Sequence, residues 1–383
     1  MQDGISGDRL TGNEAGSGRD FSGCGELLLR WYDRNRRQLP WREEPSPYHV
    51  WLSEIMLQQT RVEAVKGYYA RFLTALPDIA CLAAAEEDLC LKLWEGLGYY
   101  SRVRNLRKGA QYILETCGGE MPSTAAELVH VPGIGPYTAA AIASIAFGER
   151  IPAVDGNLLR VFARLTAYPE SIKEEKAKAA ARDFYLQWMP ADRPGDFNQA
   201  LMDLGAGVCL PNAAPACHSC PLSSFCAAHR TSSETAYPVM PEKRARQIEM
   251  RTVFLIHDAE RIALRKRPSR GLLAGLYEFP NTEGQLSEPD ALRYVRSLGF
   301  APLRIRPLEP ARHVFTHKEW HMTGYEILAD ELEPLPESST QPGSTGVRPE
   351  SPGPGAVFLA GLDEIHGRYS IPSAFTAYRK ILE

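Results

Sequence analysis

The chain has 383 residues, of which 44% are hydrophobic and 23% charged, and its formal net charge is −4. The length suits two or three domains with sizeable cores, and the net charge argues against a generally basic nucleic-acid-binding protein, although a local basic field would still attract DNA. No apolar run reaches the roughly 18 residues that a membrane helix requires, so the sequence predicts a soluble protein without a membrane partner.

The first residues, 1–23, are rich in glycine, serine and aspartate and have neither the apolar core of a secretion signal nor the arginine-rich pattern of a transit peptide. We predict a disordered tail over this range. Because the segment carries no address, the expected location is the cytoplasm.

A helix is predicted over Tyr48–Thr60, YHVWLSEIMLQQT, because its apolar residues recur with a helical period. Glu54 lies beside the apolar stripe, where burial would raise the pKa of its carboxyl and keep a proton available for general acid catalysis. The alternative is a solvated helix glutamate. The segment ends in Gln58, Gln59 and Thr60, whose amide and hydroxyl groups can hydrogen-bond base edges.

A second segment, Trp94–Tyr100, contains two glycines and two adjacent tyrosines and is followed by a basic patch that includes Arg102 and Arg104. This pattern suits a turn that inserts an aromatic ring into a base stack while the cations hold phosphates. The alternative is a core aromatic residue at a helix end.

A third segment, VPGIGPYTAAAI at 131–142, predicts a hairpin that leads into a helix. Gly133 and Gly135 allow positive φ, Pro136 suits the first helical position, and the amides of the first turn would form a phosphate site. An ordinary turn between two helices is the alternative. Further on, Asp155 precedes another helical pattern and is a good N-cap residue.

Four cysteines crowd into one loop with the spacing C-x7-C-x2-C-x5-C, at Cys209, Cys217, Cys220 and Cys226. A metal site is the favoured interpretation, because a disulfide framework needs an oxidising compartment. Zinc usually takes two separated cysteine pairs, whereas a compact loop with unequal spacings is typical of a [4Fe–4S] ligand set.

The composition changes at 230–247, which we predict to be an interdomain linker. Beyond it, 251–257 and 261–267 read as a strand hairpin and 289–298 as a helix, so an α/β module is expected over 248–383. The segment 331–355 is packed with proline, serine and glycine and is predicted to be a flexible insertion.

Seven motifs now stand in order: LPWR (39–42), WLSEIMLQQT (51–60), GLGYYSRVRNL (97–107), VPGIGPYTAAAI (131–142), VDGN (154–157), FNQALMDLGA (197–206) and the cysteine loop. Together they resemble the helix-hairpin-helix DNA glycosylases, and among them the adenine DNA glycosylases of the MutY type. The resemblance implies an all-α catalytic domain over 24–229 with a [4Fe–4S] loop at 209–226. It departs from the family at one point, where seven residues instead of six separate the first two cluster cysteines.

The resemblance also assigns roles. Such enzymes flip a nucleotide out of double-stranded DNA, and the intruding side chains correspond to Gln59 and Tyr99. Glu54 corresponds to the acid that protonates adenine, and Asp155 to the carboxylate that stabilises or captures the cationic sugar, with Asn157 orienting it. The adenine pocket corresponds to Arg42, Leu57 and Gln199, and further DNA contacts to Gln58, Thr60, Gly133 and Gly135.

Related enzymes that also cut the DNA strand carry a lysine where this chain has Tyr137, so we expect base excision without an efficient lyase step. Tyr137 would hydrogen-bond near the sugar or simply pack in its helix. Two other activities stay open: a bifunctional glycosylase and lyase of the endonuclease III type, and a lesion-binding protein without catalysis.

The C-terminal module resembles the Nudix-like domain of the same glycosylases, but it lacks the clustered acids that a working Nudix hydrolase needs to hold magnesium. Phe315, Thr316 and His317 match the family's lesion-reading Phe-Ser-His loop, with threonine in place of serine. The alternative is a strand with Val314, Thr316 and Lys318 facing outward. The resemblance thus predicts a monomer that excises adenine opposite 8-oxoguanine or guanine.

Overall fold

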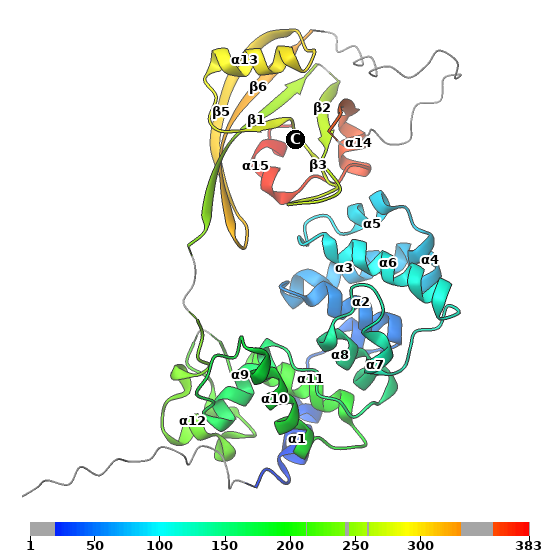
Figure 1. The fold of residues 1–383 in the computed structure, drawn as a ribbon, viewed down its shortest axis with the longest axis vertical. Helices are drawn as coiled ribbons and strands as arrows, with labels where there is room; N and C mark the ends of the chain where they lie inside the picture. Colours follow the sequence, from blue (N-terminus) through cyan, green and yellow to red (C-terminus); the bar gives the residue numbers. More distant parts are fainter. Residues whose placement is uncertain (1–19, 212, 242–244, 259, 331–354, 383) are drawn as a thin grey trace, which may run out of the picture. The chain divides into compact units, whose positions relative to one another are not determined.

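The structure is a computed structural model that describes residues 20–211, 213–241, 245–258, 260–330 and 355–382 (Figure 1). Its contacts divide the chain into two compact units, one formed by 1–58 with 112–242 and the other by 59–111 with 243–383. The region predicted as one helical domain therefore contributes to both units, and the predicted domain boundaries stay a prediction. The flexible insertion, and most of the N-terminal tail, were predicted for residues outside the described ranges.

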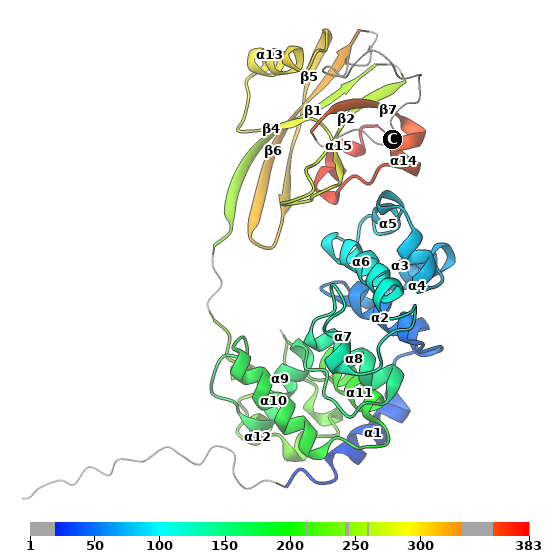
Figure 2. The same cartoon turned by 45° about the vertical axis from the view of Figure 1, so that its right-hand side comes forward.

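The first unit is helical (Figure 2). Its helices are α1 Cys24–Asn35, α2 Pro47–Leu57, α7 Ala125–Leu128, α8 Pro136–Phe147, α9 Gly156–Thr166, α10 Glu175–Trp188, α11 Pro194–Gly207 and α12 Ala227–Arg230. Short 3₁₀ helices lie at Pro40–Arg42, Cys217–Ser219, Ser223–Phe225 and Glu234–Ala236. The helix α6, Ser101–Thr116, runs from the second unit into the first.

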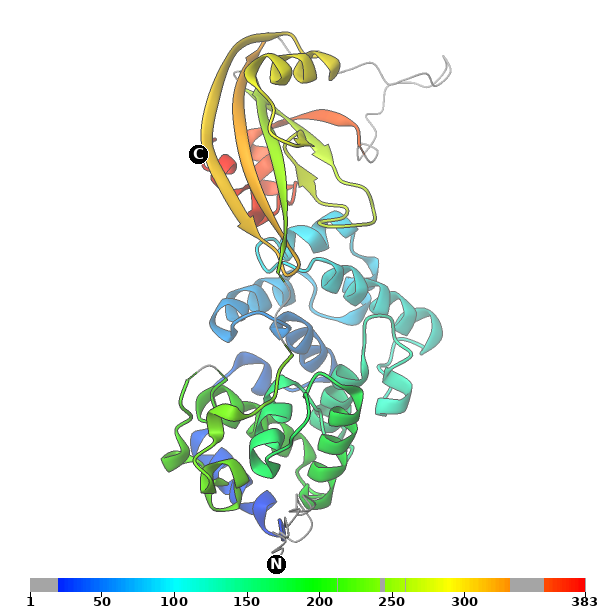
Figure 3. The ribbon, with the colours of Figure 1, turned by 60° about the vertical axis from the view of Figure 1, so that its left-hand side comes forward.

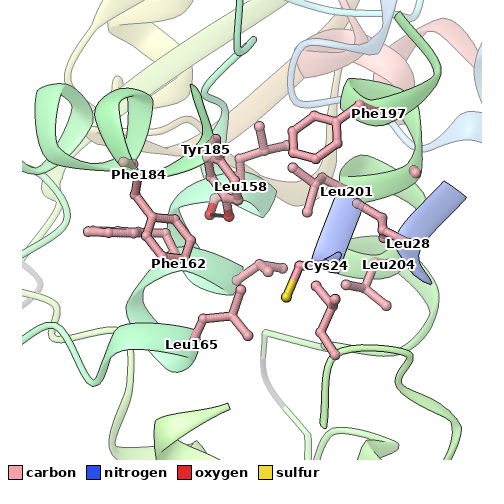
Figure 4. Packing of buried hydrophobic residues seen from close by; sticks show 14 of the residues in the cluster. Cys24, Leu28, Leu158, Phe162, Leu165, Phe184, Tyr185, Phe197, Leu201 and Leu204 are labelled. Atoms are coloured by element: carbon pink, nitrogen blue, oxygen red, sulfur yellow. Dashed lines mark hydrogen bonds between the residues drawn. The ribbon is translucent and has the colours of Figure 1, made fainter. Parts of the chain in front are cut away.

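One hydrophobic core joins α1, α9, α10 and α11 (Figure 4). Leu158, Phe162 and Leu165 recur along α9 with helical spacing and face side chains such as Tyr185 and Leu201 of the neighbouring helices. The hydroxyl of Tyr185 donates to the carbonyl of Leu158 at 2.7 Å, so this buried polar group is satisfied. Because α9 is embedded in this way, the residues at its N-terminal end have fixed positions.

The helix α2 ends earlier than the predicted range 48–60. It begins at Pro47, with Ser46 as the N-cap that accepts a hydrogen bond from the amide of His49 at 3.2 Å. It ends at Leu57, and Gln59 has a φ of +60°, outside the helical region. The predicted end was therefore wrong by three residues because the backbone turns at the two glutamines.

The second unit contains the helices α3 Val62–Ala75, α4 Ile79–Ala84 and α5 Glu87–Leu93, most of α6, and a mixed seven-stranded sheet. The strands are β1 Gln247–His257, β2 Arg261–Lys266, β3 Tyr277–Glu278, β4 Asn281–Glu283, β5 Pro302–Val314, β6 Lys318–Ala329 and β7 Val357–Gly361. The main order is β3-β2-β1-β6-β5, in which β1 and β6 are parallel, while β4 pairs with β1 and β7 with β2. The predicted α/β module, with β1 and β2 as neighbouring antiparallel strands, is confirmed.

Helices cover both faces of this sheet (Figure 3). Along β1, Phe254 and Ile256 face α13, Glu288–Ser297, while Val253 and Leu255 face α14, Leu362–Gly367, and α15, Thr376–Arg379. This alternation is the two-residue period of a strand that is buried on both faces. The helix predicted at 289–298 is confirmed as α13.

The segment predicted as a linker is partly packed against the first unit. The side-chain Nε of Arg164 donates to the carbonyls of Glu234 and Tyr237 at 2.9 and 3.1 Å, and the amide of Ile172 donates to the carbonyl of Val239. Over the described ranges, no helix is long and apolar enough to cross a membrane.

Candidate active site and cysteine loop

A buried glutamate and a tyrosine form the centre of the first unit's candidate site. Glu54 is on α2 and is 8% exposed, and Tyr137 is in the first turn of α8. The Tyr137 hydroxyl donates to Oε2 of Glu54 at 2.5 Å. The solvated-glutamate alternative is therefore wrong, and Tyr137 does more than pack in its helix.

Burial raises the pKa of Glu54 to about 7, and the negative charge of Asp155 adds to this effect. The hydrogen bond from Tyr137 and the positive charge of Arg42 act in the opposite direction. Burial likewise raises the pKa of Tyr137 well above its ordinary value, so the hydroxyl keeps its proton. Glu54 can thus hold and release a proton near neutral pH.

Asp155 is the N-cap of α9, as the sequence predicts. Its Oδ1 accepts the amide of Leu158 at 2.8 Å and its Oδ2 accepts the side-chain amide of Asn157 at 2.7 Å. Burial raises the pKa of Asp155, while these hydrogen bonds and the charge of Arg160 favour its ionised form. The cap fixes the direction of the carboxylate.

A chain of hydrogen bonds leads from Asp155 to the cysteine loop. The side chain of Asn157, which binds Asp155, accepts a hydrogen bond at its Oδ1 from Nη2 of Arg160 at 2.9 Å. In turn, Nε of Arg160 donates to the carbonyl of Cys209 at 2.8 Å. Arg160 Nη2 also donates to the carbonyl of Gly205 at 2.7 Å. The position of the Asp155 carboxylate is therefore linked, through Asn157 and Arg160, to the backbone of the loop.

Arg42 is held by a buried acid. Its Nη1 and Nη2 donate to the two carboxylate oxygens of Asp203 at 2.8 and 3.0 Å, and Arg37 binds the same carboxylate through Nε at 2.6 Å. The Asp203 side chain is only 3% exposed. Arg42 is close enough to Glu54 for their charges to interact, which supports the interpretation that Arg42 borders the same site.

The four loop cysteines line one cavity with largely apolar walls that include Val161, Leu165 and Leu204. Arg164 Nη1 donates to Sγ of Cys209 at 3.1 Å. The amide of Ala216 donates to the carbonyl of Val208, so the longer segment between the first two cysteines closes on itself and Cys209 still reaches the cavity. Four sulfur donors with a guanidinium donor beside them are a suitable ligand set for an iron–sulfur cluster.

The hairpin before α8 has one glycine in the left-handed region. Gly133 has a φ of +85°, whereas Gly135 has a φ of −88° and is the N-cap of α8. The positive φ that the sequence allowed at both glycines is therefore used only at the first. Pro136 occupies the first helical position, as predicted, and the buried side chain of Ile134 anchors the turn.

In the second unit, Tyr99 lies on an exposed turn. It is 47% exposed and has a φ of +46°, and its hydroxyl is 2.6 Å from Oγ1 of Thr316. The buried residue is its neighbour Tyr100, so the alternative of a core aromatic applies to that position. Arg102 lies over the Tyr99 ring at 5.7 Å and its Nη2 is 3.4 Å from Oγ1 of Thr60.

The residues 315–317 connect β5 to β6, and the alternative of a continuous outward-alternating strand is wrong. Phe315 is partly buried between His313 and Trp320, with ring centroids 4.6 and 4.9 Å away. Thr316 and His317 are exposed at the tip of the connection. The aromatic residue thus anchors a loop whose two polar side chains face outward.

The remaining predicted site residues are described by their exposure to solvent and the elements that carry them. Leu57 and Gln58 are partly buried at the end of α2, Gln59 is exposed, and Gln199 is partly buried on α11. Arg160, Arg164 and Asp203 were not among the residues predicted from the sequence. Two arginines four residues apart in an otherwise apolar helix pattern were the available signal, because a charged side chain on a buried face must find partners.

Two family models and several known proteins are similar to this chain. A model described as HhH-GPD superfamily base excision DNA repair protein matches residues 52–185, and a NUDIX domain model matches 252–378. A thermostable thymine-DNA glycosylase structure is similar with a TM-score of 0.49 and 26% identity, over 54% of this chain and 95% of that chain.

Two curated relatives are named adenine DNA glycosylase. The protein from Rattus norvegicus is 36% identical over 377 residues, covering 83% of this chain and 72% of the relative. The protein from Arabidopsis thaliana is 43% identical over 297 residues, covering 66% of this chain and 46% of the relative, so the match spans about half the length of that protein. With a helix-hairpin-helix glycosylase region followed by a Nudix-like domain, the chain belongs to the adenine DNA glycosylase family of N-glycosyl hydrolases.

Proposed function

We propose that this protein is a monofunctional DNA glycosylase that removes adenine mispaired with 8-oxoguanine or guanine from double-stranded DNA. The observation that carries the proposal is the pairing of Glu54, whose pKa burial raises to about 7, with the hydrogen-bonded carboxylate of Asp155. Two carboxyl groups with different environments are what hydrolysis of a glycosidic bond requires.

The reaction begins when the adenine nucleotide leaves the base stack. Glu54 gives its proton to a ring nitrogen of adenine while the bond between the sugar C1′ and the base breaks, and the bonding electrons leave with the base. Positive charge develops on the sugar, and the Asp155 carboxylate stabilises it or captures it covalently until water supplies the hydroxyl group and returns its other proton to the ionised Glu54. Tyr137 orients the Glu54 carboxyl through its 2.5 Å hydrogen bond.

Burial raises the pKa of Asp155, and the hydrogen bonds that its oxygens accept from the amide of Leu158 and the side chain of Asn157 oppose this rise. Such bonds favour a carboxylate over a carboxylic acid. We infer that Asn157 orients Asp155, and that Arg160 in turn orients Asn157.

The absence of a lysine at position 137 supports base excision alone. A lyase step needs an amine that attacks C1′ of the sugar and forms a Schiff base. The Tyr137 hydroxyl cannot replace it, because a Schiff base requires an amine nitrogen. The strand should therefore stay intact at the abasic site.

We propose DNA contacts for each unit separately. In the first unit, Gly133 and Gly135 bring the hairpin backbone and the N-terminal end of α8 to a phosphate, where peptide amides and the helix dipole favour an anion. Gln58 contributes an amide from the same unit. In the second unit, Gln59, Thr60 and Tyr99 are the proposed contacts with the disturbed base stack.

Recognition of the opposite base is proposed for the loop Phe315–His317. The exposed hydroxyl of Thr316 and the ring of His317 offer hydrogen bonds to the Hoogsteen edge of an altered purine, and Phe315 anchors the loop. The Thr316 hydroxyl also meets the Tyr99 hydroxyl, so one contact joins the lesion loop to the proposed intercalating residue. We place adenine itself next to Arg42, Leu57 and Gln199.

We further propose that Cys209, Cys217, Cys220 and Cys226 hold a [4Fe–4S] cluster. When bound, the cluster would supply a covalent framework that orders the loop, together with a redox-active centre. Arg164 would donate a hydrogen bond to the first of these ligands, Cys209.

The direct test is a single-turnover assay on a duplex with adenine opposite 8-oxoguanine, with and without alkali after the enzyme. The proposal expects adenine release and strand breakage that depends on alkali. Breakage without alkali would favour the bifunctional alternative. Binding without any release would favour the lesion-binding protein, and both results would contradict the proposal. The predicted monomer and cytoplasmic location remain predictions.

A further inference from the structure

The turn between α5 and α6 has a constrained backbone. Gly96, Gly98 and Tyr99 have φ values of +98°, +72° and +46°, a region that is unfavourable for a residue with a Cβ atom. A Cβ on Gly96 would lie 2.3 Å from the hydroxyl of Tyr68, which donates to the carbonyl of Glu95 at 2.7 Å. Such a conformation persists only where surrounding contacts hold it.

Glu95 directly precedes Gly96 in this turn, and its carboxylate accepts hydrogen bonds from three donors. Its Oε1 accepts the amide of Ile371 and Nη1 of Arg379, both at 3.0 Å, and its Oε2 accepts Nζ of Lys92 at 2.7 Å. The Glu95 side chain is 17% exposed. Charge-assisted hydrogen bonds in so sheltered a place are stronger than exposed ion pairs.

Other contacts join the helix α5, Glu87–Leu93, to residues near the C-terminal end of the second unit. Lys92 Nζ lies 3.2 Å from the carbonyl of Tyr369, and the hydroxyl of Ser370 donates to the carbonyl of Leu91 at 3.2 Å. Nearer the start of α5, Asp88 accepts the hydroxyl of Tyr277 at 2.8 Å. The Glu95 carboxylate directly precedes Gly96 of the turn, and the side chain of Ser370 also interacts with Tyr100 at the other end of the turn.

We propose that Glu95 is a positioning residue that ties the Tyr99 turn to Ile371 and Arg379 and so holds the intercalating ring ready for DNA. Local hydrogen bonds also hold the turn, from Trp94 Nε1 to the carbonyl of Gly98 and from the amide of Gly96 to the hydroxyl of Tyr100. Glu95 at its base and the contact between Tyr99 and Thr316 at its tip connect it to distant residues. The inference rests on the proposed function, because it takes Tyr99 to be the residue that enters the base stack. It assigns the last part of the chain a role in preparing that residue.

The first test is hydrogen–deuterium exchange of residues 96–100 in the full-length protein without DNA. Glu95→Gln keeps the shape but removes the charge, and Arg379→Met removes its partner, whereas Arg379→Lys can restore the ion pair. Glu86→Gln is the matched control, because Glu86 is exposed and caps the start of the same helix without a side-chain hydrogen bond. We expect faster exchange in the first two variants, by about tenfold, and wild-type exchange in the control.

The second test is binding of a duplex with uncleavable 2′-fluoroadenosine opposite 8-oxoguanine, with the rate of adenine release at saturating enzyme measured on the normal substrate. Glu95→Gln should weaken binding by about tenfold and leave the release rate within about twofold, because the carboxyl groups of the first unit are unchanged. Arg379→Lys should bind more tightly than Arg379→Met.

Unchanged exchange at 96–100 in both Glu95→Gln and Arg379→Met would show that Glu95 does not hold the turn. Faster exchange with wild-type binding would overturn its role toward DNA. A failure of the proposed function gives a different result, because the wild-type protein itself would then release no adenine. The exchange experiment would still test whether Glu95 holds the turn.

Discussion

The hydroxyl of Tyr137 donates a hydrogen bond of 2.5 Å to Oε2 of Glu54, although the two residues are 83 positions apart in the sequence. The contact joins the first turn of α8 to the buried helix α2. Burial raises the pKa of both groups, so two protons are retained side by side near neutral pH. Of the two, only the Glu54 proton has a pKa suited to transfer.

The rate of adenine release should depend on the protonation of Glu54. Because its pKa is about 7, the protonated form is dominant below that pH, and the single-turnover rate should fall about tenfold per pH unit well above it. The measurement is the release rate at saturating enzyme from pH 5.5 to 9. A rate that stays level up to pH 9 would show that Glu54 is not the acid.

Tyr137→Phe should move this fall in rate to higher pH. The Tyr137 hydrogen bond lowers the pKa of Glu54, because it stabilises the ionised carboxylate, and its loss removes that effect. The maximal rate should also drop by about one order of magnitude, because the carboxyl group loses its orienting partner. A pH profile that moves to lower pH, or does not move, would contradict this assignment.

Glu54→Gln should be stabilising relative to the wild type, and more so at higher pH. In the wild type, the unfolded chain loses the Glu54 proton near the ordinary pKa of 4.5, whereas the folded chain keeps it until about pH 7, so stability falls across this window. Glutamine does not titrate. The difference in unfolding free energy between variant and wild type should therefore grow by up to about 3 kcal/mol between pH 4.5 and 8.

Urea unfolding at pH 5 and pH 8 measures this difference. Glu44→Gln, at an exposed position just before the same helix, is measured alongside as the matched control. A constant difference for Glu54→Gln would mean that its pKa is not raised in the folded state.

Gly205→Ala should impair catalysis through Asn157. A Cβ at Gly205 would lie 2.6 Å from Cβ of Asn157, whose amide holds Asp155. Displacement by a fraction of an ångström to one ångström should slow adenine release by about 10- to 100-fold. Gly207→Ala is the control, because a Cβ there meets no atom within 4 Å. Equal rates of adenine release for the two variants would show that Asn157 does not position Asp155 for catalysis.

Cys209→Ser should lose most of the bound iron. The cavity that Cys209 shares with the other loop cysteines indicates that the seven-residue spacing still permits ligation. Iron and acid-labile sulfide should be measured per protein, with Cys81→Ser as the control because Cys81 is exposed and remote from the loop in sequence. Full iron content in Cys209→Ser would exclude this cysteine as a ligand.

Local pattern accounts for much of the agreement between sequence and structure. The apolar period of α2, the proline at the start of α8, the cap of α9 at Asp155 and the neighbouring strands β1 and β2 all follow from rules that act over a few residues. The end of α2 was missed because a left-handed backbone at Gln59 has no strong sequence signal.

Contacts between distant residues could not be derived in the same way. The hydrogen bonds from Arg42 to Asp203 and from Arg160 to the carbonyl of Cys209 depend on how helices pack, and the sequence around each residue does not identify its partner. The same holds for Glu95, whose partners Ile371 and Arg379 come from the far end of the chain. Only the packed fold brings these charges into sheltered positions, where their partners become necessary.

The most direct measurement of the central claim compares wild type with Glu54→Gln on duplexes that carry adenine opposite 8-oxoguanine, guanine or thymine. The wild type should release adenine fastest opposite 8-oxoguanine and most slowly opposite thymine, whereas Glu54→Gln should not release it at a comparable rate. This variant should still bind the 8-oxoguanine duplex. Equal release from all three duplexes would contradict the proposed recognition of the opposite base, and undiminished release by Glu54→Gln would contradict the proposed chemistry.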